Sequence, residues 1–600
     1  MFGVSGRNQR GFIVRRTLTR VRSTFLSLGI AVASLLCAQS AAMAQSSGTP
    51  SVILTIPSSA LVAQMPAPPT PPTAPPPPTS CTTPDDVYKN YACLDAFLGE
   101  DIFTRFINYY RLEWGQAGPP TDPNAPASRI DGWPRPAATT PPMPYTEWPM
   151  GAVTPMGVTR PNSVDSPFMA AIANTDVGRW MYDNHIQFYG WVNGGFNLST
   201  NSTQPNGNAP IGYAYTPNVA QFDQGVFYIE RFPDTVQTEN FDWGFRLSFL
   251  YGENYRYTNS YGLGSYQFNG HNNIYGWDVP MEYADLYWPK PFNSLISGLQ
   301  VRVGRYISIP DIEAQLAPNN ITYTHSLTYT WDNYTNNGIV ASLQIDPNLM
   351  VQLGLSDGTE TPIWNCCRSL TNLFGPNPLY GGPNYRRDPG NQPSATACVR
   401  YSWNDGWDNF YPCMNAFNNG AWGYNNLQWT GFTYYHRFND QWHIDFESYY
   451  EFENGVPNLR NPTAVNIFEN GGTPFSSPYI HFNAPNLVYC HNAYELTCNP
   501  YSIGTVLYIN YTTDPLNNFT LRPEWYDDPY GWRTGTGGRT EYAEVTLSWQ
   551  HWLSPQIEFR PEMGYWRSIG TPAFNGNAIK GIPANKRDTG LFAADVILHF

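Results

Sequence analysis

Apolar and polar side chains alternate at every second position in many short stretches between residue 185 and the C-terminus. Near the end of the chain, Phe592, Val596 and Leu598 fall on one face of an extended backbone, and Asp595 and His599 fall on the other. A period of two is typical of a β-strand whose two faces meet different surroundings. The pattern therefore predicts an all-β structure in this part of the chain.

The connections between these stretches alternate between long and short when the chain is read backwards from its C-terminus. A long connection, Arg567–Asp588, precedes the last strand, and a tight turn at Leu553–Pro555 precedes the strand before it. Long loops on one rim and short turns on the other are typical of an outer-membrane barrel, whereas a soluble sandwich has no reason to alternate so regularly. The chain is therefore predicted to form a transmembrane antiparallel β-barrel.

The alternating stretches predict about 14 strands, an even number as bacterial barrels require. They are expected at residues 185–198, 225–231, 241–250, 280–288, 298–306, 338–345, 349–356, 427–437, 442–452, 502–511, 518–527, 540–550, 556–566 and 590–600. A further hairpin within Ile321–Trp331 would give 16 strands, which is the alternative. Aromatic rings such as Trp243, Trp549, Trp552, Tyr565 and Trp566 are interpreted as belonging to lipid-facing positions and interfacial girdles.

The N-terminal region differs from the barrel in composition. Basic residues precede an apolar stretch, Phe25–Leu36, and small residues at Ala42 and Ala44 follow it. This order predicts a cleaved signal peptide over residues 1–44, with an N-terminal anchor helix as the alternative. Residues 45–184 are expected to form an N-terminal extension, with a Pro-rich spacer and a short helix, and residues 185–600 to form the barrel.

Composition and charge exclude several classes of protein. The 600 residues are 42% apolar but only 13% charged, and after residue 44 no apolar run approaches the ~20 residues that a spanning helix needs. The formal net charge is −14, from 33 basic and 47 acidic residues. Nucleic-acid binding requires basic clusters, so no nucleic-acid partner is expected.

Eight cysteines remain after removal of the signal peptide, and an even number in an exported chain favours disulfides. Local bridges are expected between Cys81 and Cys93 and between Cys490 and Cys498, with Cys366, Cys367, Cys398 and Cys413 paired among themselves in an unknown order. The latter four lie in the predicted long loop 357–426, which their bridges would fold as a lid. No metal site is expected, because no His and Cys spacing resembles that of a zinc site.

Charged residues on the polar faces of the strands are the candidates for a channel lining. They are Arg246, Arg302, Asp445, Glu447, Glu451, Arg522, Glu524, Glu558, Arg560 and Glu562. The triplet Arg-Pro-Glu occurs twice, at 522–524 and 560–562. These side chains either form ion pairs that support the wall or set up a transverse field that orients hydrated solutes. Because acidic groups outnumber basic ones, a mild cation preference is expected.

One long connection, Ile307–Asn337, is a candidate for a loop that folds inward and constricts the channel. It holds Asp311, Glu313, His325 and Asp332. An ordinary external loop is the alternative, and the sequence leaves both open.

Several stretches resemble a known family, the OmpL-like beta-barrel porins (outer-membrane beta-barrel porin, type 2). They are FYGWVNGGFN at 188–197, WGFRLSFLYGENYRYT at 243–258, YADLYWPKP at 283–291 and the stretch 301–338. The C-terminal half matches only in pattern. The resemblance implies an outer-membrane porin. The terminal Phe600 resembles the C-terminal signature that the barrel-assembly machinery reads, and is therefore the candidate assembly signal.

The expected function is a porin that lets small hydrophilic solutes diffuse passively across the bacterial outer membrane. The alternative is a surface adhesin or structural barrel that binds partners through large disulfide-held loops. No enzyme activity is expected, since the sequence carries none of the common catalytic motifs, and no cofactor is implied. The expected partners are outer-membrane lipid, the barrel-assembly machinery and small solutes, and a homotrimer is left open.

Overall fold

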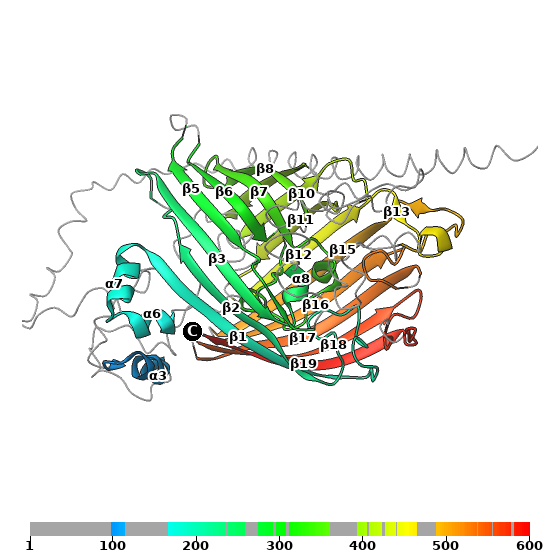
Figure 1. Cartoon of the computed structure of the whole chain (residues 1–600), viewed down its shortest axis with the longest axis horizontal. Coiled ribbons are helices and arrows are strands. Elements are labelled where there is room, and N and C mark those ends of the chain that lie inside the picture. The colour runs from blue at the N-terminus through cyan, green and yellow to red at the C-terminus, as the bar shows by residue number, and fades with distance from the viewer. Residues whose placement is uncertain are drawn as a thin grey trace, which may run out of the picture. The chain divides into compact units, whose positions relative to one another are not determined.

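The structure is a computed structural model of the whole chain (Figure 1). The residues that it describes are 98–113, 166–235, 237–258, 274–291, 296–307, 311–359, 393–404, 407–422, 426–439, 441–464, 488–514, 516–536, 538–554, 556–577 and 581–600. The chain divides into two units after residue 76, and all of these residues lie in the second unit. The expected signal peptide, the Pro-rich spacer and Cys81, Cys93, Cys366 and Cys367 lie outside the described residues.

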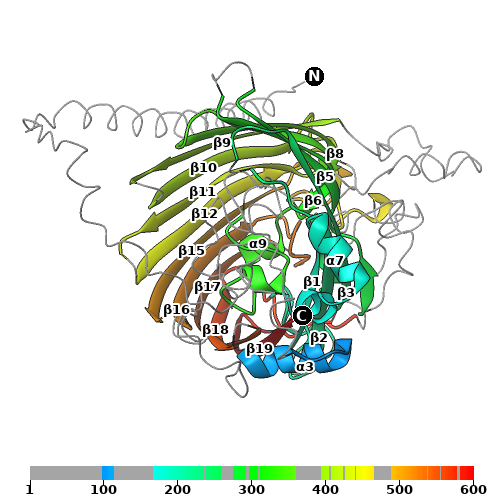
Figure 2. The same cartoon turned by 90° about the vertical axis from the view of Figure 1, so that its left-hand side faces the viewer.

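The described strands of unit two form one closed antiparallel barrel (Figure 2). They are β1 (Ile186–Ser199), β2 (Ala220–Arg231), β3 (Asp242–Gly252), β4 (Gly276–Asp278), β5 (Glu282–Pro289), β6 (Gly298–Ile307), β7 (Thr335–Gln344), β8 (Leu349–Thr359), β9 (Ser394–Trp403), β10 (Asp408–Phe417), β11 (Gln428–Arg437), β12 (Trp442–Phe452), β15 (Tyr501–Asp514), β16 (Asn517–Asp528), β17 (Thr540–Ser554), β18 (Ile557–Ser568) and β19 (Asp588–His599). The short β4 and the β5 that follows it pair with different parts of β3, so together they occupy one place in the ring. The 17 strands named above therefore make a barrel of 16.

The barrel closes where the first strand meets the last. β1 pairs with β19 in an antiparallel register that runs from Trp191 opposite His599 to Ser199 opposite Leu591. The terminal Phe600 extends this seam, because its N–H donates to the Gly190 carbonyl and its carbonyl accepts from the Gly190 N–H, at 2.8 and 3.0 Å. Closure leaves no unpaired strand edge at this seam, which lipid could not satisfy.

The two faces of the wall differ as the alternation predicts. In β8, Leu353 and Leu355 are 55% and 69% exposed, whereas Gln352 between Val351 and Leu353 is fully buried. Apolar side chains therefore point outward and polar ones inward, the arrangement of a barrel in lipid. The short connections also fall on one rim, between β7 and β8, β9 and β10, β11 and β12, β15 and β16, and β17 and β18.

The expected 14 strands were too few, and the alternative of 16 is confirmed. The additional hairpin is not within Ile321–Trp331, where the described residues hold only a short helix. It is formed by β9 and β10, which lie inside the stretch 357–426 that was expected to be a single long loop. Two rings assigned to the lipid face, Trp552 and Trp566, are buried instead, at 1% and 0% exposure.

Two disulfides are present among the described residues. Cys490 bonds to Cys498, as the sequence predicts, in the long connection between β12 and β15. Cys398 bonds to Cys413 across the β9–β10 hairpin, where the two residues are register partners. The Cys398–Cys413 bridge therefore lies in the wall and holds no lid, which corrects the expectation for that pair.

The long connection between β12 and β15 also carries a two-stranded sheet of β13 (Val456–Pro457) and β14 (Thr497–Cys498).

Three helices precede the barrel in the described residues: α3 (Ile102–Glu113), α6 (Pro167–Ile172) and α7 (Asp176–Asp183). The short helix expected in the N-terminal extension, within the stretch Leu94–Trp114, corresponds to α3, and the other two were not expected. The buried Arg105 of α3 donates to the carbonyls of Ala170 and Ala171 at 2.8 and 3.0 Å. None of the described helices is long and apolar enough to cross a membrane.

Candidate functional site

The described part of the connection between β6 and β7, residues 311–334, lies inside the barrel. Every residue from 311 to 334 is buried, and this stretch, termed the inserted segment, contains the 3-10 helix η5 (Ala317–Asn319) and the helix α9 (Leu327–Thr330). Figure 2 shows α9 within the ring of strands. The expected candidates Asp311, Glu313, His325 and Asp332 therefore all lie in the interior. Whether the segment constricts an open channel stays a prediction.

The glutamates of the two Arg-Pro-Glu triplets hold the inserted segment by its backbone. Glu562 of β18 accepts from the N–H groups of Tyr323 and Thr324 at 3.0 and 3.1 Å. Glu524 of β16 accepts from the N–H groups of Leu327 and Thr328 at 2.8 and 2.5 Å. Hydrogen bonds to a carboxylate are stronger than neutral ones, so these four bonds fix the segment against the wall.

The arginines of the same triplets satisfy carbonyl groups of the segment. Arg522 donates to the Thr324 carbonyl at 2.5 Å and pairs with Glu544 of β17 at 2.8 Å. Arg560 donates to the carbonyls of Ala317 and Asn320 at 2.7 and 2.8 Å, and it pairs with a carboxylate of β19, Asp595. No ion pair joins the two triplets within the described residues. Each triplet thus combines a wall ion pair with a clamp on the segment.

The other arginine candidates form ion pairs between neighbouring strands. Arg246 of β3 pairs with Glu230 of β2 at 2.6 Å, and Arg302 of β6 pairs with Asp285 of β5 at 2.8 Å. Arg302 also lies 3.7 Å from the ring centroid of Tyr283. For Arg246 and Arg302, the interpretation as wall ion pairs fits these contacts.

The acidic candidates are buried on the interior face, each with a different partner. Asp445 accepts from the Asn510 side chain at 2.7 Å, and Glu558 accepts from Gln550 at 2.5 Å. Glu451 lies 3.2 Å from Arg533, and Glu447 accepts from the Ile312 N–H at 2.9 Å. Glu447 therefore contacts the start of the inserted segment, whereas Asp445 and Glu558 bind side chains of neighbouring strands.

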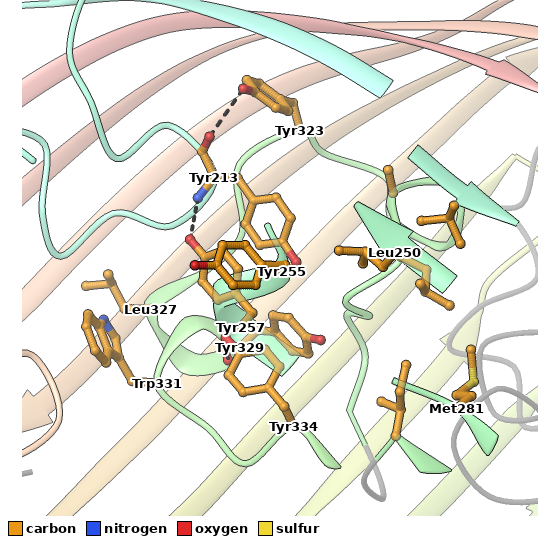
Figure 3. Close-up of a cluster of buried hydrophobic side chains, with 14 of the residues drawn as sticks. Tyr213, Leu250, Tyr255, Tyr257, Met281, Tyr323, Leu327, Tyr329, Trp331 and Tyr334 are labelled. Carbon is orange, nitrogen blue, oxygen red and sulfur yellow. Dashed lines mark hydrogen bonds between the residues drawn. The ribbon is translucent and has the colours of Figure 1, made fainter. Parts of the chain in front are cut away.

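Aromatic rings pack around the inserted segment in the interior, at positions that the sequence analysis did not predict. Figure 3 shows Tyr213, Tyr257, Tyr323 and Tyr329 together in the interior, and all four are buried. Tyr257 accepts from the Tyr213 N–H at 2.7 Å, and Tyr323 donates to the Tyr213 carbonyl at 3.2 Å. The ring of His325 stacks on Tyr213 with 3.6 Å between centroids. Tyr257 lies in the short helix α8 (Tyr255–Thr258) and Tyr329 in α9, whereas Tyr213 and Tyr323 lie in loops. None of them is in a strand, so the alternation of the sequence did not indicate them.

Three carboxylates meet at the base of the segment: Asp311, Asp332 and Glu447. One oxygen of each lies within 4.8 Å of one oxygen of the others. Burial raises the pKa of Asp311 well above its usual range and that of Asp332 to about 7. Carboxylate oxygens are ligands of hard cations such as Ca²⁺, so these three are the described residues that could hold a metal.

Comparison with known proteins identifies the family. The model of the family described as "Putative beta-barrel porin-2, OmpL-like" matches residues 185–600. The chain belongs to this family. It is thus a porin of the bacterial outer membrane, and the resemblance to OmpL-like porins seen in the sequence is confirmed. No curated protein matches the chain.

Solved outer-membrane proteins resemble this OmpL-like porin only distantly. The outer membrane channel DcaP of Acinetobacter baumannii is 9% identical, with 69% of this chain and 97% of that chain covered and a TM-score of 0.40. An anion-selective porin from Comamonas acidovorans is 8% identical, with 69% and 99% covered and a TM-score of 0.37. OmpT of Vibrio cholerae is 10% identical, with 69% and 97% covered and a TM-score of 0.37.

Proposed function

We propose that this porin forms a water-filled channel for the passive diffusion of small hydrophilic solutes, narrowed by the inserted segment. The observation that carries the proposal is the clamp on residues 311–334, in which Glu524 and Glu562 hold the segment inside the barrel. A segment fixed across a barrel reduces its bore and brings polar groups close to a passing solute. The ten charged wall residues named from the sequence are proposed as the surroundings of this channel.

Charge balance in the interior supports a mild cation preference. The buried arginines Arg246, Arg302, Arg522 and Arg560 each form an ion pair with a carboxylate. Several buried carboxylates form no ion pair with an arginine or lysine within the described residues: Asp223, Asp311, Asp332, Glu447, Glu524 and Glu562. An interior with more carboxylates than cationic side chains attracts cations.

Bilayer recording tests this proposal. Purified protein in a planar bilayer with a KCl gradient should show stepwise conductance and a reversal potential whose sign reports cation preference. A reversal potential of the opposite sign would overturn the cation preference. A barrel that inserts but conducts no ions would favour the alternative, a surface adhesin or structural barrel.

The proposal extends to biogenesis and assembly. Residues 1–44 are proposed as a cleaved signal peptide, 45–184 as a Pro-rich spacer and short helical N-terminal extension, and 185–600 as the barrel domain. Phe600 is proposed as the signal read by the barrel-assembly machinery, and a homotrimer stays a prediction. Deletion of Phe600 should reduce the amount of folded protein in the outer membrane, and chemical crosslinking in membranes measures the number of chains per assembly.

A further inference from the structure

The three carboxylates at the base of the inserted segment come from its two ends and from the wall. Asp311 begins the segment, Asp332 lies three residues before β7, and Glu447 belongs to β12. They are 3%, 0% and 1% exposed. Twenty-one positions of sequence separate the two aspartates, yet the fold brings both against one glutamate of the wall.

Each of these carboxylates has an oxygen atom with no hydrogen-bond partner. The three atoms are Asp311 Oδ1, Asp332 Oδ2 and Glu447 Oε1. Buried carboxylates without a partner are unfavourable because the interior cannot replace the water that solvated them. Ionised carboxylates at this place would therefore need a positively charged ligand, and without one they are favoured in the protonated form.

The arginines near the cluster are engaged elsewhere. Arg522 lies 2.8 Å from Glu544 and 3.5 Å from Glu313, and Arg533 lies 3.2 Å from Glu451. Arg533 donates to the backbone carbonyl of Asp332 at 2.9 Å, and no ion pair to the Asp332 carboxylate is found within the described residues. Glu544, Glu313 and Glu451 thus each have an arginine within ion-pair distance. Among the described residues the three carboxylates of the cluster have no such ion pair, although Arg533 attracts the Asp332 carboxylate at longer range.

The remaining oxygens orient two of the carboxylates. Glu447 Oε2 accepts from the Ile312 N–H at 2.9 Å. Asp332 Oδ1 accepts from the backbone and side-chain nitrogens of Asn333 at 2.5 and 2.7 Å. These bonds fix the side chains while leaving the second oxygen of each unpartnered, which is the arrangement of ligands supported by outer hydrogen bonds.

The spacing of the oxygens fits a calcium ion. Ca²⁺ binds carboxylate oxygens at about 2.3–2.6 Å, so two of its ligands lie at most about 5 Å apart. The observed limit of 4.8 Å between one oxygen of each residue falls within this range. A ligand set of oxygens alone, without His or Cys, favours a hard cation over zinc or copper.

We propose that Asp311, Asp332 and Glu447 bind one hard divalent cation, best matched by Ca²⁺. The ion ties both ends of the inserted segment to β12 and compensates the negative charge at its base. Bound cation would thus complement the clamp that Glu524 and Glu562 form on the middle of the segment. The competing occupant is a proton shared between the two aspartates.

Calcium titration of the folded full-length protein tests the site. Protein in detergent, treated with EDTA and exchanged into metal-free buffer near neutral pH, is titrated with CaCl₂ by isothermal calorimetry. The proposal expects a site of one Ca²⁺ per chain that weakens by roughly 10-fold or more in Asp332→Asn and in Glu447→Gln. Glu558→Gln, which removes a buried interior carboxylate outside the cluster, should leave binding unchanged.

A second measurement covers variants that fold poorly. Ca²⁺ should raise the melting temperature of the wild-type protein relative to EDTA, because a ligand that binds only the folded state stabilises it. The same increase should be absent from whichever of the two variants folds. Absence of Ca²⁺ binding by the wild-type protein overturns the proposal in favour of the shared proton. Binding of undiminished affinity in both variants places the ion elsewhere and overturns it equally.

Discussion

At the scale of single residues, the two Arg-Pro-Glu triplets make the same kinds of hydrogen bond to the backbone of the inserted segment. In each triplet the arginine donates to carbonyls of the inserted segment and the glutamate accepts from its N–H groups. The intervening prolines, Pro523 and Pro561, lie on the other face of the strand and keep the two polar side chains on the interior side. The triplet thus provides both partners that a peptide backbone requires.

Loss of both glutamates should release the segment. In Glu524→Ala combined with Glu562→Ala, buried N–H groups lose their acceptors, at a cost of about 1–3 kcal/mol for each unsatisfied group. Chymotrypsin, which cleaves after aromatic residues such as Tyr323 and Tyr329, should then cut the segment faster. Asp445→Ala is the control, because Asp445 accepts from Asn510 of the wall and contacts neither the segment nor its arginines in the described hydrogen bonds. Equal cleavage rates in the double variant and the wild-type protein would contradict the clamp.

His325 should make the barrel less stable in acid. Burial lowers the pKa of His325 well below its usual range, and the nearby guanidinium groups of Arg522 and Arg560 lower it further. The ring also faces Tyr213 and Tyr329. Below about pH 6.5 the unfolded chain therefore takes up a proton that the folded chain does not, and stability falls by up to ~1.4 kcal/mol per pH unit.

The measurement is the difference in melting temperature between the wild-type protein and His325→Gln as the pH is lowered. Buried carboxylates such as Glu313, whose pKa burial raises, change stability in the opposite direction, so only the comparison isolates the histidine. As the pH falls, the melting temperature of the wild-type protein should decrease relative to that of His325→Gln. A difference that stays constant with pH would show that folding leaves the proton affinity of His325 unchanged, which would contradict this prediction.

At the scale of elements, the sequence predicted strands well where their alternation is regular and poorly where it is blurred. β9 and β10 were missed because cysteines and Tyr411 point inward and Pro412 lies within β10, so both faces are partly apolar. For residues 311–334, the sequence left two alternatives open, a loop folded into the barrel and an ordinary external loop. Its partners Glu524 and Glu562 follow 197 and 239 positions after the residues that they bind, and no local pattern indicates such contacts.

The β9–β10 disulfide should stabilise the wall without affecting the channel. Cys398 and Cys413 are 15 residues apart with Cα atoms 4.2 Å apart. Replacing both by Ala should lower stability by up to ~3 kcal/mol, the entropy of closing a loop of this length, while strand hydrogen bonds keep the barrel closed. Thermal unfolding and single-channel conductance measure the two effects. Replacing Cys490 and Cys498 serves as the control outside the wall, and a change of conductance only for the β9–β10 pair would contradict this account.

At the scale of the whole molecule, closure of the barrel depends on a glycine at the seam. A Cβ added to Gly190 would lie 2.1 Å from the Val226 carbonyl oxygen and 2.8 Å from the ring of Phe600. Gly190→Ala should therefore lower the fraction of protein that folds, measured by the different migration of folded and heated barrels in gels. Gly194→Ala in the same strand is the matched control, since its nearest atom is 3.5 Å away. Equal folding of both variants would contradict a tight seam.

The central claim is that the barrel is an open channel narrowed by the inserted segment. Its most direct test is the single-channel conductance of the wild-type protein beside a variant in which residues 313–330 are replaced by a short Gly-Ser linker. The account predicts discrete conductance steps for the wild-type protein and larger steps for the variant. No steps from correctly folded wild-type barrels, or steps of equal size from both proteins, would contradict it.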